Sequence, residues 1–150
     1  ELEKIIKEFG EERHARKIAK EIYSRERRKP IETTGELVET ILRALPAGKQ
    51  GGRIHPATRT FMAFRIYANH ELENLEKVLQ DLPKILKSGG RAAIISFHSL
   101  EDRLVKNYFR DYAKAGKMEI LTKKPIMASR EEIVANPRAR SAKLRIAVMQ

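Results

Sequence analysis

Residues 89–109 read Gly-Gly-Arg-Ala-Ala-Ile-Ile-Ser-Phe-His-Ser-Leu-Glu-Asp-Arg-Leu-Val-Lys-Asn-Tyr-Phe, and the rest of the chain is organised around this stretch. The two glycines end the element that precedes them. The run from Ala92 to Phe97 is apolar without alternation, which is typical of a strand covered on both faces, as in a parallel sheet. Apolar residues then recur at helical spacing from Leu100 to Tyr112. We therefore expect a buried strand that opens through a polar turn into a helix.

The polar turn between that strand and that helix is the first candidate for a functional site. In open α/β sheets, ligands bind beyond the carboxyl ends of the strands. Ser99 is the expected N-cap of the helix, and Glu101 and Asp102 in its first turn complement the helix dipole. Capping does not account for His98, nor does it exclude a further role for the acidic residues. The turn thus places potential proton acceptors at the end of a strand.

The charge balance points to a polyanionic partner. The 150 residues include 31 Lys and Arg against 20 Asp and Glu, for a net charge of +11. Such an excess favours nucleic acid first and an anionic membrane surface second, whereas a generally soluble or thermophilic surface is the alternative. No acidic residue occurs between Glu39 and Glu71 or after Glu132, although basic residues continue in both segments. These two segments are the better candidates for phosphate contacts.

Several classes of site are absent from the sequence. The chain has no cysteine, which excludes disulfides and thiolate metal sites and fits a reducing cytoplasm. No run approaches the ~20 apolar residues of a membrane span, and we expect no signal peptide. The sequence contains no Gly-x-Gly-x-x-Gly, no phosphate-binding loop with its lysine, no His pair at i, i+4 and no Gly-x-Ser-x-Gly. The sequence therefore predicts no metal site and does not favour a hydrolase.

The first third of the chain predicts a group of short helices. Apolar spacing predicts three helices within residues 1–45, the first ending at Gly10 and the third beginning with a capping box of Thr33 and Glu36. The Gly-rich basic connector at 46–56 is the predicted subdomain boundary, and Pro56 is expected at the first position of the next helix.

The remaining two thirds predict helices and strands together. An amphipathic stretch from Leu72 to Leu86 is kinked or restarted at Pro83, and it leads into the Gly89 turn. Residues 118–122 form a second strand candidate, and Ser129 and Glu132 form another capping box. Residues 143–149 alternate in polarity, which predicts a last strand with one more exposed face, compatible with an antiparallel edge.

Three polar blocks carry a family resemblance. They read His-Pro-Ala-Thr-Arg-Thr-Phe at 55–61, Ile-Ser-Phe-His-Ser-Leu-Glu-Asp-Arg at 95–103, and Asn-Pro-Arg-Ala-Arg-Ser-Ala-Lys-Leu-Arg at 136–145. In this order and at these spacings they resemble the bacterial 16S rRNA cytosine-N4 methyltransferases, the MraW family. The early stretches Phe-Gly-Glu-Glu-Arg at 9–13 and Thr-Thr-Gly-Glu-Leu at 33–37 also look like that family's helical insertion. The resemblance covers essentially the whole chain.

The resemblance implies an α/β fold: the C-terminal part of a Rossmann-like class I methyltransferase sheet, preceded by a helical insertion domain. Residues 1–50 would form the helical, substrate-recognition subdomain, and residues 51–150 the C-terminal half of the methyltransferase domain. It also implies that a first half, with the glycine-rich loop and acid that hold S-adenosylmethionine, is missing, so no cofactor-binding residue is assigned. A strand edge exposed at Ala92 would then favour a homodimer or partial disorder.

The implied activity is methyl transfer from S-adenosylmethionine to the N4 amine of a cytidine in the 16S rRNA of the small ribosomal subunit, in the cytoplasm and without a membrane partner. His98, Glu101 and Asp102 are the candidate catalytic residues, and this stretch by itself would be inactive. The candidate RNA-binding residues are Arg59, Arg65, Arg103, Arg138, Arg140 and Lys143. The alternatives are a non-catalytic basic RNA-binding or ribosome-assembly module, or an oligomerisation piece that pairs through residues 72–86.

Overall fold

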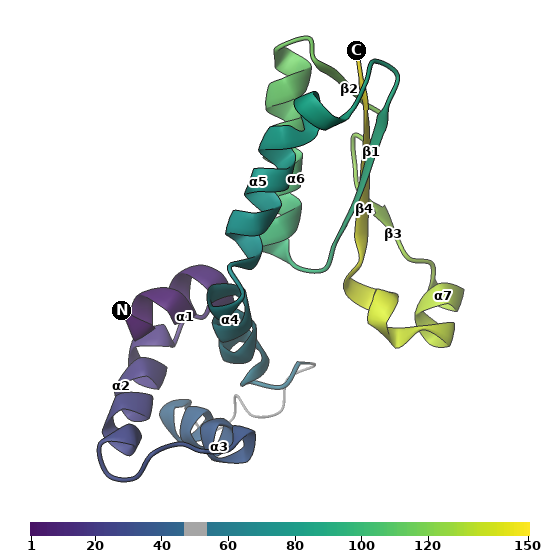
Figure 1. Ribbon diagram of the computed structural model, residues 1–150. Coiled ribbons are helices and arrows are strands. Elements are labelled where there is room, and N and C mark those ends of the chain that lie inside the picture. The colour runs from purple at the N-terminus through teal and green to yellow at the C-terminus, as the bar shows by residue number, and fades with distance from the viewer. Residues whose placement is uncertain (47–53) are drawn as a thin grey trace. The chain divides into compact units, whose positions relative to one another are not determined.

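The computed structural model describes residues 1–46 and 54–150, which form two compact units, Glu1–Glu71 and Leu72–Gln150 (Figure 1). The subdomain boundary expected between residues 50 and 51 lies outside the described residues. The described part of the first unit is helical, whereas the second combines helices with a small antiparallel sheet. The mixed α/β composition expected from the sequence is confirmed. No helix within the described ranges is long and apolar enough to cross a membrane.

Four helices build the described part of the first unit: α1 (Leu2–Gly10), α2 (Ala15–Glu26), α3 (Thr34–Ala44) and α4 (Thr58–Ala68). The three helices predicted within residues 1–45 are confirmed. Helix α1 packs against α4 and α2, and α2 packs against α3. Their apolar faces meet in one core cluster of buried residues, which comprises Ile6, Ala15, Ile18, Ala19, Ile41 and Ala57.

Local side-chain contacts set the starts of two of these helices. The capping box of α3 is confirmed, since Thr33 Oγ1 accepts a hydrogen bond from the Glu36 N–H at 3.2 Å while the Glu36 carboxylate accepts from the Thr33 N–H. Helix α4 starts at Thr58 and not at Pro56, because Pro56 lies in a preceding turn. That turn is closed by the His55 ring, whose Nδ1 accepts from the Ala57 N–H at 3.2 Å.

The second unit contains both helices and strands. Helix α5 (Glu71–Ile85) runs through Pro83 in its last turn and leads to β1 (Arg91–Ser96) by way of Gly89, which has a φ of +79°. The later elements are α6 (Ser99–Lys114), β2 (Met118–Ile120), β3 (Ile126–Met127), α7 (Arg130–Ala135), the 3₁₀ helix η1 (Pro137–Ser141) and β4 (Lys143–Met149).

The sheet has β4 at its centre. Strand β4 pairs with β1 along one edge and with β2 and β3 along the other, and every pairing is antiparallel. The prediction of a parallel sheet around residues 92–97 is therefore wrong. The antiparallel strand expected at 143–149 is confirmed, but it lies at the centre of the sheet and not at its edge. The burial of β1 alternates, with Ala92 and Ser96 buried and Ile95 56% exposed, so β1 is covered on one face and not on both.

Helices α5 and α6 lie together on one face of the sheet (Figure 1). The core between them and the sheet comprises Leu79, Leu82, Ala92, Val105, Phe109, Met118, Ala147 and Met149. Arg145 and Ala147 of β4 are buried, while Ile146 between them is half-buried. The side of β4 that carries Arg145 is therefore the covered side, which brings this arginine to the first turns of α6.

Candidate functional site

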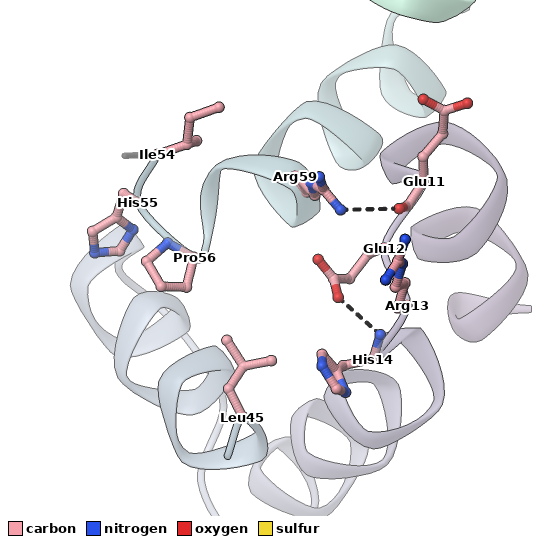
Figure 2. A pocket seen from close by; sticks show the side chains of 9 residues that line it. All are labelled: Glu11, Glu12, Arg13, His14, Leu45, Ile54, His55, Pro56 and Arg59. Atoms are coloured by element: carbon pink, nitrogen blue, oxygen red, sulfur yellow. Dashed lines mark hydrogen bonds between the residues drawn. The ribbon is translucent and has the colours of Figure 1, made fainter. Parts of the chain in front are cut away.

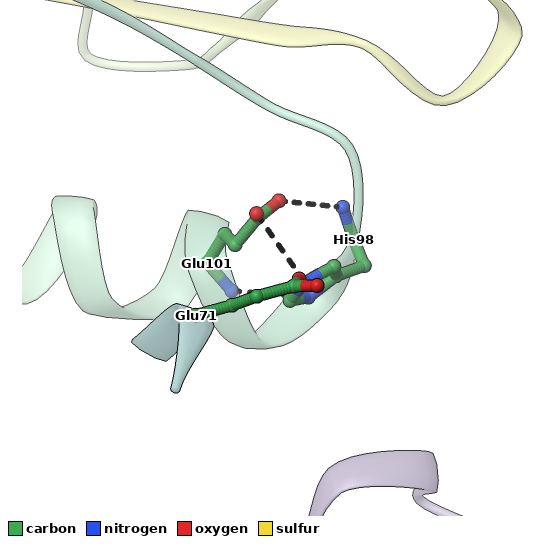
Figure 3. Close-up of side chains that lie close together, drawn as sticks. All are labelled: Glu71, His98 and Glu101. Atoms are coloured by element: carbon green, nitrogen blue, oxygen red, sulfur yellow. Dashed lines mark hydrogen bonds and ion pairs between the residues drawn. The ribbon is translucent and has the colours of Figure 1, made fainter. Parts of the chain in front are cut away.

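The turn between β1 and α6 is closed by His98 and Glu101. His98 has extended backbone angles, φ −139° and ψ 169°, and its Nδ1 accepts a hydrogen bond from the Glu101 N–H at 3.3 Å. In return the Glu101 carboxylate accepts from the backbone N–H of His98 at 3.3 Å (Figure 3), and also from that of Phe97 at 2.8 Å. The N-cap is thus His98, and the prediction of Ser99 is wrong, because the imidazole nitrogen reaches the donor that a serine hydroxyl normally serves.

The His98 ring is nearly enclosed in this turn. Its side chain is 7% exposed, and its Nε2 lies 3.4 Å from the second oxygen of Glu101, whose side chain is 22% exposed. Both ring nitrogens therefore lie beside Glu101: Nδ1 accepts its backbone N–H, and Nε2 lies near its carboxylate. These contacts hold the end of β1 and leave the Phe97 side chain 53% exposed beside them.

Asp102 lies in the first turn of α6 and is bound by the last strand. Its carboxylate accepts two hydrogen bonds from the Arg145 guanidinium, at 2.7 and 3.2 Å, and the Lys143 ammonium lies 3.6 Å away. The hydrogen bond from Arg145 lowers the pKa of Asp102, against the raising effect of burial, and the charges of Arg145 and Lys143 lower it further. Asp102 is accordingly an anion held by two cations, suited to fixing the turn and poorly suited to taking up a proton near neutral pH.

The basic block before β4 has its arginines in solvent. Arg138 and Arg140 are exposed on η1, while Ala139 between them is 6% exposed and anchors the short helix. Within residues 1–46 and 54–150, neither arginine forms an ion pair. Lys143 follows at the start of β4 and reaches Asp102, so the block at 136–145 meets the polar turn after β1. Two of the three sequence motifs are thereby brought together in the second unit.

The other predicted RNA-binding residues have different surroundings. Arg65 in the first unit donates two hydrogen bonds to the Glu71 carboxylate, at 2.8 and 3.1 Å, so its charge is already paired; Glu71 is also drawn in Figure 3. Arg59 donates to the Glu11 carbonyl oxygen at 3.3 Å and lines a pocket (Figure 2). Arg103 is exposed on α6, where it lines a shallow groove against α5. Of these cations, Arg65 and Lys143 form ion pairs, Arg59 donates to a carbonyl oxygen, and Arg138 and Arg140 face solvent.

Two features of the site escaped the sequence-based prediction. The sequence places Arg145 in the last basic block but does not predict its pairing with Asp102. Only the alternation of residues along β4 indicated that the Arg145 side chain lies on a defined face of the sheet. Glu12 and Arg13 lie in one of the stretches that carried the family resemblance, yet nothing in that stretch indicated that they face Arg59 across a pocket.

Comparisons with known proteins agree on one family. A family model described as the MraW methylase family matches residues 1–150. The chain is 54% identical over 148 residues to the ribosomal RNA small subunit methyltransferase H of Koribacter versatilis (strain Ellin345), covering 98% of this chain and 46% of that protein. It is 52% identical over 147 residues to the protein of the same name from Persephonella marina, covering 98% and 50%. The chain therefore spans about half the length of these curated relatives.

Proposed function

Because the chain belongs to the MraW methylase family, we propose that it works in the methylation of ribosomal RNA of the small subunit. The observation that carries this proposal is the family match along all 150 residues, together with identities of 54% over 148 residues and 52% over 147 residues to proteins named for that activity. The methyl acceptor we propose is the N4 amine of a cytidine in 16S rRNA, and the methyl donor is S-adenosylmethionine.

The acceptor amine sets the chemical task of the site. The lone pair of a cytosine amine is conjugated with the ring, so the amine is a weak nucleophile that gains from being positioned and from donating its N–H groups to fixed acceptors. We assign this acceptor role to the Glu101 carboxylate in the first turn of α6. His98, whose Nδ1 already accepts the Glu101 N–H, holds that carboxylate in place. Asp102 acts through Arg145, because their ion pair ties the first turn of α6 to β4 and so fixes the position of the other two.

The described residues do not form a cradle for the methyl donor. The turn after β1 is filled by its own capping contacts, and the sequence has no Gly-x-Gly-x-x-Gly. We therefore assign no residue of this chain to the methyl donor.

Arg138 and Arg140 are the residues we assign to the RNA backbone. They are exposed and, among the described residues, unpaired, so their guanidinium groups can bind phosphate oxygens without first giving up an internal ion pair. The target base has to leave its stack to reach any active site. Contacts from Arg138 and Arg140 to the RNA backbone, close to the polar turn after β1, would hold the RNA strand while the target base leaves its stack.

Methyl transfer to 16S rRNA tests the proposal. The chain is joined to the part of the Koribacter versatilis relative that it does not cover, and the product is incubated with tritiated S-adenosylmethionine and 16S rRNA or small subunits. We expect label in the RNA, and His98→Ala should lower turnover more than it lowers affinity for the methyl donor. Lys106→Ala, on the exposed side of α6, is the matched control and should leave both unchanged.

The outcomes separate the enzyme from a non-catalytic module. A chimera that is folded by circular dichroism, binds RNA and transfers no label would contradict the enzyme and favour the RNA-binding module, for which the net charge of +11 is the supporting observation. If His98→Ala leaves the turnover unchanged, the role assigned to His98 is wrong, whereas the proposed activity stands.

A further inference from the structure

A pocket of about 620 Å³ opens in the helical unit, where the turn between α1 and α2 faces the segment that leads into α4 (Figure 2). Gly10 ends α1 so close to α4 that an added Cβ would lie 2.8 Å from the Arg59 carbonyl oxygen. Glu11 follows with a φ of 47°, and its own carbonyl oxygen accepts a hydrogen bond from the Arg59 guanidinium at 3.3 Å. Two segments that are far apart in the sequence are thus fixed against each other around the pocket.

Donor groups line the pocket from both segments. Arg13 and Arg59 each carry a planar guanidinium with five N–H donors. The His55 ring accepts the Ala57 N–H at Nδ1, so in the neutral ring the proton lies on Nε2, which is a donor. Groups of this kind bind the phosphate oxygens of nucleic acids.

A buried carboxylate faces the same space. Glu12 is 9% exposed, and Figure 2 shows its carboxylate directed into the pocket between Arg59 and His14. One of its oxygens accepts the His14 N–H at 2.8 Å. Since an ionised carboxylate has about four lone-pair sites, it can accept further hydrogen bonds. An acidic peptide or a lone phosphate would be repelled by this group, so a fitting ligand brings N–H donors as well as an anion.

The remaining wall is apolar. Leu45, Ile54 and Pro56 line it, and Ile54 is 56% exposed. Apolar surface beside a few placed polar groups is the usual lining of a small-molecule site, and the volume lies within the roughly 300–1,000 Å³ of such sites. A flat base has the shape and the apolar faces to pack on this wall.

We propose that this pocket binds a guanine nucleotide of unpaired RNA. Guanine presents two adjacent donors, N1–H and N2–H, on its Watson–Crick edge and so matches the two oxygens of Glu12, whereas the other three bases present one donor group there. Arg13 and Arg59 take the phosphate, and the base face lies on the apolar wall. The net charge of +11 favours a polyanionic strand over a free nucleotide. That this RNA is ribosomal rests on the proposed function; the preference for guanine does not.

Fluorescence anisotropy with two single-stranded RNA hexamers tests the proposal on the chain itself. Both are oligouridine, one with a central guanosine and one with a central inosine, which lacks only the N2 amine. We expect the guanosine hexamer to bind about tenfold more tightly, as one matched base contact gives. Equal affinities for the two hexamers would overturn the proposal.

Two variants separate the base contact from the phosphate contact. Glu12→Gln keeps an acceptor for the His14 N–H but replaces one carboxylate oxygen by a donor, so the ratio of the two affinities should fall to about one. Arg13→Gln should weaken both hexamers equally and reduce the salt slope by about 0.7. Arg28→Gln, exposed beyond the end of α2, is the control and should change neither. A guanosine preference that survives Glu12→Gln in a folded protein would contradict the assignment.

Competition by GMP distinguishes RNA from a free nucleotide. If the ligand is RNA, GMP displaces the guanosine hexamer only at concentrations far above the affinity of the hexamer; displacement at equal concentration would overturn the RNA assignment. Methyl transfer by the chimera without a guanosine preference would refute this pocket and spare the proposed function. A guanosine preference without methyl transfer would support this pocket and contradict the proposed function.

Discussion

Asp102 in the first turn of α6 and Arg145 in the centre of β4 form a two-point ion pair, with hydrogen bonds of 2.7 and 3.2 Å between carboxylate and guanidinium. Arg145 is 6% exposed, so its charge is compensated almost entirely from inside the protein. The pair joins the polar turn after β1 to the basic block before β4. Together with Lys143 and the pairing of β1 with β4, it links two residues that are 43 positions apart in the sequence.

Removing the Asp102 carboxylate should destabilise the chain strongly. Asp102→Ala leaves the buried Arg145 guanidinium without its partner, and we expect a loss of about 3 kcal/mol in the free energy of unfolding. Arg145→Met should cost less, since it removes the buried charge itself. Urea denaturation of both single variants and the double variant gives the coupling energy. A coupling near zero would show that the pair does not stabilise the fold.

The contribution of Asp102 should depend on pH. Its pKa is lowered in the folded state, so the stabilisation is complete above its ordinary value of 3.8 and is lost as the pH falls through the lower folded value. The stability difference between the wild type and Asp102→Asn should therefore be constant from pH 7 to pH 5 and shrink below about pH 4. Denaturation curves at pH 7, 5 and 3 measure it. A difference that grows on acidification would contradict this assignment.

The N-cap role of His98 predicts which of two substitutions at this position destabilises the chain more. His98→Ala removes the acceptor for the Glu101 N–H and should cost about 1 kcal/mol, whereas His98→Asn supplies an amide oxygen in its place and should cost a few tenths. Thermal unfolding followed by circular dichroism compares the two variants with the wild type. Equal losses for both variants would show that the ring acts by packing and not as a cap.

Close packing of α1 on α4 predicts that Gly10 tolerates no side chain. A Cβ at this position would lie 2.8 Å from the Arg59 carbonyl oxygen, so Gly10→Ala should cost about 1–3 kcal/mol. Gly35→Ala is the matched control, because its nearest atom would be 3.9 Å away in the first turn of α3, and it should be neutral or stabilising. Destabilisation by both changes alike would argue against the close approach.

The exposed arginines of η1 predict a change in salt dependence. The double change Arg138→Glu/Arg140→Glu removes two phosphate contacts and should lower the slope of log affinity for single-stranded RNA against log salt by about 1.4. Lys106→Glu/Arg110→Glu on the exposed side of α6 changes the net charge equally and serves as the control. If both double variants flatten the slope alike, the effect is one of overall charge.

Local signals accounted for most of the helical unit. The apolar spacing of α1 to α3 and the capping box of Thr33 and Glu36 both act within a few residues, so sequence alone was sufficient to predict them. The cap of α6 was mispredicted because histidine is a rare N-cap, and only the folded turn shows that its ring nitrogen meets the Glu101 N–H.

Non-local pairing accounted for most of what the sequence did not predict. The short run of apolar residues from Ala92 to Ile95 predicts the strand β1 but neither its partner nor its direction, and the partner lies some 50 residues further on. The alternation in β4 gave two faces, but the ion pair with Asp102 turns Arg145 inward. The pocket around Glu12 joins residues 11–14 to residues 54–59, a contact that no local pattern records.

The identity of the methylated nucleoside tests the account most directly. The chimera is incubated with 16S rRNA and S-adenosylmethionine that carries a deuterated methyl group, and the RNA is digested to nucleosides for mass spectrometry. We predict a deuterated methyl on the N4 amine of cytidine, reduced in proportion to turnover by His98→Ala. Deuterated methyl on another base or on ribose, or none in a folded chimera that binds the RNA, would contradict the account.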